Sequence, residues 1–358
     1  MATSEVALKL RKKVRDRHEM PEEATEETED LWDTKKVCPY GFQRPDDFDY
    51  VAYNRFLRHY APILKRREKK WASLLKHGFG LELVTRKKLR RYIRKGISKE
   101  YRCRVWLSVS GALKRMESNR GLYQTVLKGE RDAAVVEAIK MDIRRTFPDN
   151  VRFAHDTKGN LLGSLENVLT AYAHYNKKVG YCQGLNFVAG MLLLVAETEE
   201  EAFWLLLVLV EKILPENYYN LRGVWIDIGV LKTIMEERLP LLLNHFDANG
   251  IDLNIVAARW FICLFVDVLH AETLLRVWDC LFNEGSVILF RVALTLLIQS
   301  EKEILACEDL NEILTAYKKI GNKTFDCHAF TLSLFQLPEK LKRKQIDLAR
   351  KRQSDSAT

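Results

Sequence analysis

Residues 161–178 read LLGSLENVLTAYAHYNKK and carry a clear periodic pattern. Leu165, Val168, Leu169 and Tyr172 follow one another at the spacing i, i+3, i+4, i+7. On a helix this spacing places all four side chains on one face, which can then pack against a core. The stretch therefore predicts an amphipathic helix.

Similar apolar stripes recur between residues 201 and 319, and no internal repeat of fixed period is visible. Alternating apolar and polar residues, and short β-branched runs between turn signals, are scarce, although these are the marks of β-strands. We therefore expect an all-α fold.

The chain has 358 residues, of which 47% are hydrophobic and 29% charged, as is usual for a folded protein. Residues 1–36 alternate acidic and basic side chains without apolar periodicity, so we expect a disordered tail. Residues 37–95 begin with the extended segment PYGFQRPDDFDY and continue as a helical lead-in. Residues 336–358 are predicted to form a basic terminal helix or tail.

Three features bear on location. The longest apolar runs, FVAGMLLLVA from residue 187 and AFWLLLVLV from residue 202, are about half the length of a bilayer span. The first residues lack the apolar core of a signal peptide. Seven cysteines occur without a C-x-x-C pair, which favours free thiols in a reducing compartment over disulfides or zinc. We expect a cytoplasmic protein without a transmembrane helix.

The formal net charge is +9, and the excess gathers in three stretches: KRREKK from residue 65, RKKLRRYIRK from residue 86 and EKLKRKQIDLARKRQ from residue 339. A nucleic acid or a membrane surface could attract such charge. Aromatic residues that would stack on bases are not interleaved with these stretches. We therefore expect solvated faces and no nucleic-acid partner, while a basic membrane-surface adaptor remains an alternative.

Residues 141–150, MDIRRTFPDN, place two adjacent arginines at a predicted helix end. Pro148 disfavours helical geometry at Phe147, so the helix should end near Thr146 and leave Arg145 beyond its last turn. Asp142 lies three residues earlier, where it can contact Arg145. Basic residues at helix ends are also favoured by the macrodipole, by about 0.3–1 kcal/mol, but that effect does not account for a carboxylate that orients one of the two arginines.

Residues 180–187, GYCQGLNF, form the second candidate element. Gly180 and Gly184 allow a tight turn between a helix that ends near Lys178 and an apolar helix that begins after Leu185. Such a turn exposes Gln183, whose amide can donate and accept hydrogen bonds and so can orient a water or a phosphate oxygen. The alternative is a helix connection in which the glutamine caps a backbone group.

An arginine beside its orienting carboxylate and a glutamine on a glycine loop are the groups needed to hydrolyse a nucleoside triphosphate that is bound elsewhere. The phosphate-binding pattern G-x-x-x-x-G-K-[ST] is absent from the chain, so a partner must hold the nucleotide. No metal-ligand or cysteine-nucleophile pattern is present either. We expect no cofactor of its own and no intrinsic active site for a small substrate.

Five motifs occur in this order: GISKEYRCRVW from residue 96, IKMDIRRTFP from 139, YCQG from 181, RWFICLF from 259 and RVWDCLF from 276. Together they resemble the TBC (Tre-2/Bub2/Cdc16) domain of Rab GTPase-activating proteins, over residues 96–335. The resemblance implies a V-shaped, all-α, multi-helix domain with an N-terminal extension and a basic C-terminal tail.

The resemblance also implies an activity, the stimulation of GTP hydrolysis by Rab-family small GTPases in vesicle trafficking. Arg145 would be the arginine finger and Gln183 the glutamine finger, both supplied in trans. Asp142 would hold Arg145, while Tyr181 and Gly184 would shape the glutamine loop. The GTP-bound Rab partner would carry GTP and Mg, and could bring the protein transiently to a membrane. The alternative is a non-catalytic helical scaffold that binds a GTPase or another partner.

Two further expectations concern the architecture. Ser98 stands where the TBC family usually has proline, and a serine at this position can instead cap the helix that follows. Arg276 and Asp279 are three residues apart in RVWDCLF, so they can pair on one helix.

Overall fold

The computed structural model describes residues 35–76, 81, 84–338 and 341–356. Regular structure in these ranges is helical, apart from two isolated β-bridges that join Val37 to Gln43 and Phe42 to Asn150. The all-α prediction is confirmed. The charged tail predicted at residues 1–36 lies, except for its last two residues, outside the described residues.

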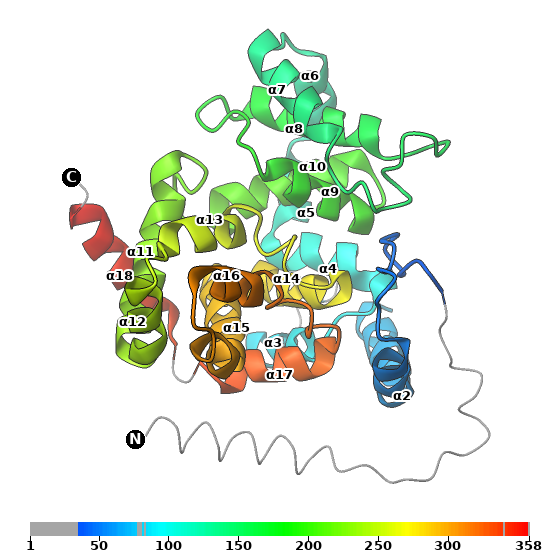
Figure 1. Ribbon diagram of the computed structural model, residues 1–358. Helices are drawn as coiled ribbons and strands as arrows, with labels where there is room; N and C mark the ends of the chain where they lie inside the picture. Colours follow the sequence, from blue (N-terminus) through cyan, green and yellow to red (C-terminus); the bar gives the residue numbers. More distant parts are fainter. Residues whose placement is uncertain (1–34, 77–80, 82–83, 339–340, 357–358) are drawn as a thin grey trace.

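The first half of the chain supplies the helices of the upper part of the molecule, the connection to the lower part and two helices that lie in the lower part, those of residues 50–75 and 86–95 (Figure 1). These helices are α2 (Tyr50–Leu75), α3 (Arg86–Lys95), α4 (Lys99–Ser110), α5 (Ala112–Ser118), α6 (Leu122–Lys128), α7 (Ala133–Ile143), α8 (Leu162–Tyr175), α9 (Leu185–Val195) and α10 (Glu199–Val208), and a π-helical turn, Leu209–Ile213, follows them. The helices α6 to α10 gather at the top in Figure 1.

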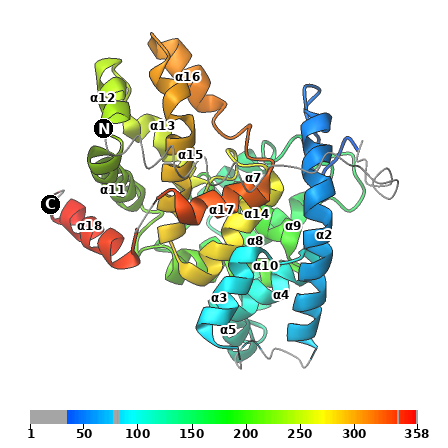
Figure 2. The ribbon, with the colours of Figure 1, turned by 90° about the horizontal axis from the view of Figure 1, so that it is seen from below.

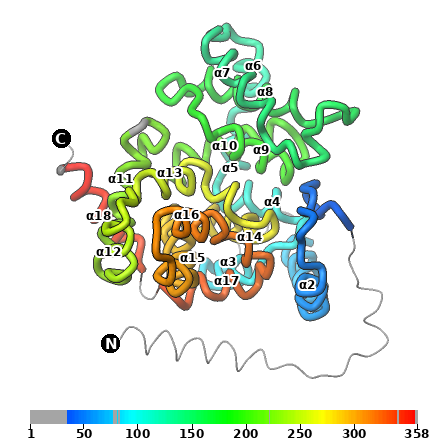
Figure 3. The backbone as a smooth tube through the Cα atoms, viewed as in Figure 1, coloured from blue at the N-terminus to red at the C-terminus, as the bar shows by residue number. Residues whose placement is uncertain are grey.

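The second half builds most of the lower part. Its helices are α11 (Leu221–Arg238), α12 (Pro240–Ala248), α13 (Leu253–Ile262), α14 (Ala271–Glu284), α15 (Val287–Leu305), α16 (Leu310–Lys318), α17 (Cys327–Gln336) and α18 (Arg343–Ser356). Figure 3 shows the C-terminal helix α18 beside α11. An ion pair joins the two helices, because Arg350 donates to both carboxylate oxygens of Asp227 at 2.6 and 2.8 Å.

The apolar stripe predicted in residues 161–178 is the buried face of α8. All four of its residues, Leu165, Val168, Leu169 and Tyr172, are at most 1% exposed. They face a core to which α6, α7, α9 and α10 also contribute. The stripe therefore directs α8 into the core, as its spacing predicts.

The two longest apolar runs are core helices. All the residues of α10 from Ala202 to Val208 are buried, and so is most of α9. A helix that is apolar on every side must be covered on every side, and here its neighbours in the upper group do so. No helix in the described ranges combines the length and the apolar character needed to cross a membrane.

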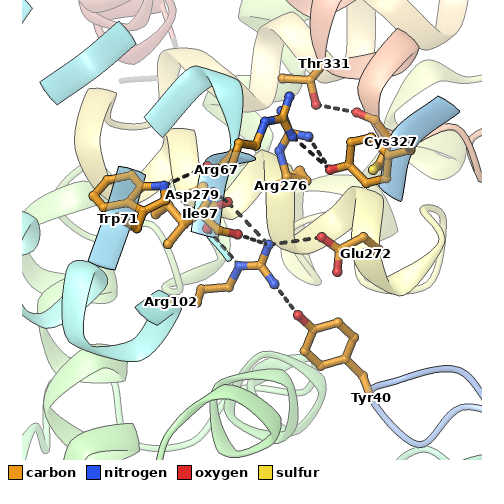
Figure 4. A network of polar contacts seen from close by, with 12 residues as sticks. Tyr40, Arg67, Trp71, Ile97, Arg102, Glu272, Arg276, Asp279, Cys327 and Thr331 are labelled. Carbon is orange, nitrogen blue, oxygen red and sulfur yellow. Dashed lines mark hydrogen bonds and ion pairs between the residues drawn. The ribbon is translucent and has the colours of Figure 1, made fainter. Parts of the chain in front are cut away.

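A buried polar network joins α4 to α14 (Figure 4). Arg102 pairs with Asp279 at 3.0 Å, and the indole N–H of Trp106 donates to the same carboxylate oxygen at 2.8 Å. Arg102 also donates to the hydroxyl of Tyr40, which anchors the extended N-terminal segment. The charged pair is fully buried, so its hydrogen bonds must be satisfied inside the protein.

Arg276 does not form with Asp279 the ion pair that their spacing allows. Arg276 donates to the Tyr60 hydroxyl at 2.9 Å and to the backbone oxygen of Arg94 at 3.0 Å. Packing of α4 against α14 brings Arg102 to Asp279 and turns Arg276 toward α2 and α3. Proximity on one helix allows a pair, but here the neighbouring helices determine the partner.

Ser98 does not form the helix cap that its position allows. Residue 98 has the extended backbone of a cap position, with φ −68° and ψ 149°, but its side chain makes no cap hydrogen bond to α4. The Ser98 hydroxyl is buried and has no hydrogen-bond partner among the described residues. The Ser98 hydroxyl therefore accepts from none of the N–H groups of the first helical turn, as a capping side chain would.

The basic stretches are more than solvated faces. In the stretch from residue 65, Arg67 is only 8% exposed, so this part of the prediction is wrong. In the stretch from residue 86, which forms α3, Arg94 pairs with Glu284 of α14. The helices α2 and α3 therefore direct part of their charge inward.

Candidate functional site

Arg145 lies just beyond the end of a helix, although that helix ends earlier than predicted. The last residue of α7 is Ile143, three residues before Thr146. Phe147 has a left-handed backbone with φ 51°, so helical geometry has ended there, although a residue before proline more often takes the extended region. Its ring packs against other aromatic rings, Phe42, Phe153 and Phe187, in edge-to-face geometry. This buried anchor fixes the turn that carries Arg145.

Asp142 orients Arg145, as the spacing predicts. The Nε of Arg145 donates to Oδ1 of Asp142 at 2.9 Å, and Nη2 lies 2.6 Å from the same oxygen. The carboxylate is 9% exposed, whereas the arginine side chain is 58% exposed. One side of the guanidinium is therefore held by the protein while the group as a whole faces solvent.

Tyr181 holds the other side of the carboxylate. Its hydroxyl donates to Oδ2 of Asp142 at 2.5 Å. Burial, followed by the hydrogen bond to Asp142, raises the pKa of Tyr181, so the hydroxyl keeps its proton and remains a donor. Asp142 thus accepts from both an arginine and a tyrosine, and its side chain has little freedom to turn.

Gln183 lies on the predicted glycine turn. The preceding helix α8 ends at Tyr175 and α9 begins at Leu185, so the connection starts three residues earlier than expected. The side chain of Gln183 is exposed and, within the described part of the chain, hydrogen-bonds to no other residue. It therefore caps no backbone group there and is accessible to a partner.

Gly184 is required at its position for two reasons. Its φ of +107° lies in the range that favours glycine, and a Cβ there would stand 2.4 Å from Cγ2 of Ile262. Gly180 also has a positive φ, +59°, but its Cβ would meet open space. Gly184 therefore packs the glutamine turn against α13, whereas Gly180 only allows the chain to bend.

Asn186 is a site residue that the sequence reasoning missed. It is fully buried, its amide nitrogen donates to the Thr146 hydroxyl at 2.8 Å, and its oxygen accepts from the N–H of Gly184 at 3.0 Å. The available signal was one amide side chain in the otherwise apolar run LNFVAGMLLLVA. A buried amide in such a run needs hydrogen-bond partners, and the two turns supply them.

Two long-range hydrogen bonds therefore connect the turn of Arg145 with the turn of Gln183. One joins Tyr181 to Asp142 and the other joins Asn186 to Thr146. Each partner stands within three residues of the arginine or the glutamine in sequence. The predicted residues thus form one connected unit, with an exposed cation and an exposed amide on its surface.

Comparison with known proteins shows which family the chain resembles. Residues 99–305 match the profile of the Rab-GTPase-TBC domain. The chain belongs to this family. It is 45% identical to growth hormone-regulated TBC protein 1 of Homo sapiens over 309 residues, which cover 86% of this chain and 91% of the human protein.

The chain is also similar to a yeast protein and to a solved structure. The GTPase-activating protein MSB4 of Saccharomyces cerevisiae is 35% identical over 314 residues, which cover 76% of this chain and 64% of the yeast protein. The crystal structure of the Chlamydomonas flagellar RabGAP TBC domain superposes with a TM-score of 0.73 at 30% identity, covering 84% of this chain and 99% of that one.

Proposed function

We propose that this protein stimulates GTP hydrolysis by a Rab-family small GTPase and supplies Arg145 and Gln183 in trans. Membership of the Rab-GTPase-TBC family supports a Rab partner. Similar yeast proteins, MSB4 and GYP3, carry the name GTPase-activating protein. The observation that carries the proposal is the exposed Arg145 guanidinium, oriented by a carboxylate that Tyr181 holds from its other side.

Arg145 would stabilise the charge that develops on the phosphoryl oxygens. Phosphoryl transfer spreads negative charge over these oxygens, and an arginine supplied in trans accelerates GTP hydrolysis by about 10³–10⁵. The carboxylate of Asp142 fixes one side of the guanidinium in advance, so fewer arginine conformations are lost on binding. The exposed side is left to meet the nucleotide of the partner.

Gln183 would align the attacking water. An amide is a poor base but can accept a hydrogen bond from the water and donate one to a phosphate oxygen. In this proposal the partner binds in its GTP-bound state and brings both GTP and Mg. The protein itself contributes no cofactor and acts as an activator of the partner's reaction.

We place this activity in the cytoplasm. All seven cysteines are free, which suits a reducing compartment. Any contact with a membrane would come transiently through the Rab partner, and the activity requires no nucleic acid.

The test measures phosphate release from a panel of GTP-loaded Rab GTPases. We compare the wild-type chain with Arg145→Ala and Gln183→Ala, and we use Arg144→Ala as the control because Arg144 is an exposed arginine one position away. Wild type and Arg144→Ala should stimulate at least one Rab, and both finger variants should lose most of that stimulation. Rabs that bind the wild-type chain without faster hydrolysis would instead support the non-catalytic scaffold.

A further inference from the structure

Residues 37–43, which we call the strap, lie ahead of the family domain of residues 99–305. An antiparallel bridge between Val37 and Gln43 closes the strap into a short loop. The strap leads toward α2, which Figure 2 shows at the edge of the molecule. Its contacts run in two directions, toward α4 and toward the turn that carries Arg145.

One side of the strap is fixed to α4. The Tyr40 side chain is buried, and its hydroxyl accepts a hydrogen bond from Arg102, whose guanidinium also pairs with Asp279 (Figure 4). The ammonium of Lys99 donates to the backbone oxygen of Pro39 at 2.7 Å and lies 5.0 Å from the centre of the Tyr40 ring. The buried network between α4 and α14 therefore holds the strap in place.

The backbone of the strap also pairs with the chain that follows Arg145. The N–H of Gln43 donates to the oxygen of Asp149 at 2.8 Å. The N–H of Val151 donates to the oxygen of Gly41 at 2.9 Å. Two stretches that are distant in sequence are therefore joined like neighbouring antiparallel strands.

The side chain of Asn150 adds a further bond between the two stretches. It is buried, its amide nitrogen donates to the backbone oxygen of Tyr40 at 3.0 Å, and its oxygen accepts from the N–H of Arg152 at 2.9 Å. Gly41 allows this approach, because its φ is +92° and a Cβ there would stand 2.5 Å from the side-chain oxygen of Asn150. Displacement of the strap would take the partner from a buried amide nitrogen, which is unfavourable.

Phe42 covers the residue that ends the arginine turn. Its ring meets the ring of Phe147 edge to face, with centroids 5.1 Å apart. Phe147 stands two positions after Arg145 and has a left-handed backbone, which a non-glycine residue keeps only where its surroundings hold it. Helix α9 supports the ring as well, since a Cβ at Gly190 would stand 2.7 Å from it. The strap and α9 together hold the backbone of the arginine turn.

We infer that the strap is a positioning element for Arg145, an inference that rests on the proposed function. The strap joins the arginine turn to the buried network of α4 and α14 and covers Phe147, so Arg145 leaves α7 in one direction and stays beside Asp142. The described residues 144–161, which follow α7, contain no helix, so local structure alone does not fix the turn. A finger that is aligned in advance loses fewer conformations when the nucleotide of the partner arrives.

The first experiment separates alignment of the finger from binding of the partner. Phe42→Ala removes the ring that covers Phe147. Phe48→Ala is the matched control, because this ring is also half-buried but packs against Tyr50 and His270. The rate of stimulated phosphate release is measured over a range of concentrations of GTP-loaded Rab.

Phe42→Ala should lower kcat about 10- to 100-fold and change KM by less than about twofold, because the arginine acts in the transition state. Phe48→Ala should leave both values near those of wild type. An unchanged kcat in Phe42→Ala, or an equal decrease in the two variants, would overturn the inference.

Hydrogen exchange tests the hold on the turn without any Rab. Full-length wild type and both variants are compared by amide exchange of residues 144–151, which include the N–H of Val151 that donates to Gly41. Exchange there should become faster in Phe42→Ala and stay unchanged in Phe48→Ala. Unchanged exchange in Phe42→Ala would overturn the inference whatever the rates show.

Phe42→Leu keeps an apolar cover but loses the edge-to-face contact, so it should show the same changes in smaller size. It takes the place of Phe42→Ala if that variant does not fold, and normal kcat and normal exchange in it would then count against the inference. If wild type stimulates no Rab, the proposed function fails, and the exchange experiment still decides whether the strap holds the turn.

Discussion

The buried amide of Asn186 donates a hydrogen bond of 2.8 Å to the hydroxyl of Thr146. The Thr146 hydroxyl in turn donates to the backbone oxygen of Asp142 at 2.8 Å, and Asn186 accepts from the N–H of Gly184. This chain of hydrogen bonds connects the turn that carries Arg145 with the turn that carries Gln183. Removal of one member leaves buried polar atoms without partners, which costs more than the bond itself contributes.

Thr146→Val should therefore weaken both stability and activity. Valine keeps the shape of threonine but has no hydroxyl, so we expect the free energy of unfolding to fall by about 1–3 kcal/mol. Rab stimulation should fall as well, because the arginine turn loses its link to Asn186. Urea unfolding and phosphate release measure the two effects. Thr146→Ser, which keeps the hydroxyl, should retain most of both, and equal behaviour of the two variants would contradict the proposed link.

Tyr181→Phe should reduce activity and should also lower the free energy of unfolding, because a nearly buried carboxylate loses a hydrogen-bond donor. It removes the donor to Oδ2 of Asp142 and leaves the carboxylate held only by Arg145. A hydrogen bond to a charged group contributes about 1.5–3 kcal/mol, so kcat/KM for stimulated hydrolysis should fall about 10- to 100-fold. The control is Tyr175→Phe, which loses a hydroxyl that accepts from Arg115 away from the site. An unchanged kcat/KM in Tyr181→Phe would show that the hydrogen bond from Tyr181 to Asp142 does not contribute to activity.

Alanine substitutions should distinguish the two glycines of the glutamine turn. Gly180→Ala meets only backbone strain, so unfolding free energy should fall by about 1–2 kcal/mol. Gly184→Ala meets the same kind of strain and also an overlap with Ile262, so the loss should reach about 2–5 kcal/mol. Urea unfolding of both variants is the measurement. If both lose the same amount, the close approach to Ile262 does not matter.

Ser98→Pro should stabilise the protein. The φ of residue 98, −68°, is already the value that proline requires, and proline removes a buried hydroxyl that has no partner in the described residues. Restriction of the unfolded chain adds about 0.4–1 kcal/mol to the unfolding free energy. Thermal and urea unfolding test this, with Ser98→Ala to separate loss of the hydroxyl from restriction of the backbone. A gain in Ser98→Ala as large as that in Ser98→Pro would remove the backbone explanation.

Arg350→Leu should destabilise the protein in a pH-dependent way. It leaves the buried Asp227 carboxylate without its partner, which typically costs about 3–5 kcal/mol. Burial raises the pKa of Asp227 above its usual value and Arg350 opposes that effect, so the variant should raise it further. A carboxyl whose folded pKa is raised adds stability below its unfolded pKa and loses it as pH rises through the folded pKa.

The deficit of Arg350→Leu should therefore be largest at neutral pH and shrink as acid protonates Asp227. Urea unfolding at neutral and mildly acidic pH measures the change. Lys351→Leu removes an exposed charge from the same helix and should show no such trend. A deficit that is constant across pH would mean that Asp227 keeps its charge in the variant.

Local spacing in the sequence was enough to predict several features of the structure. The stripe in residues 161–178 predicted a helix and its buried face, because burial follows the helical period. The contact of Asp142 with Arg145 could be predicted because the two residues lie within one helical turn of each other. The positive φ of Gly180 and Gly184 could be predicted because a short connection between two helices requires a tight turn. Each of these features depends on residues that are a few positions apart.

Tertiary packing decided which distant groups meet. Tyr181 contacts Asp142 across 39 positions, Asn186 contacts Thr146 across 40, and Asp279 pairs with Arg102 across 177 although Arg276 is much closer in sequence. The sequence by itself determined the helices and the local pairs on them, because those obey the geometry of one turn. The packing of whole helices decided which long-range partners meet. Every buried polar group needs a hydrogen-bond partner, and several groups could supply one, so the helix arrangement selects among them.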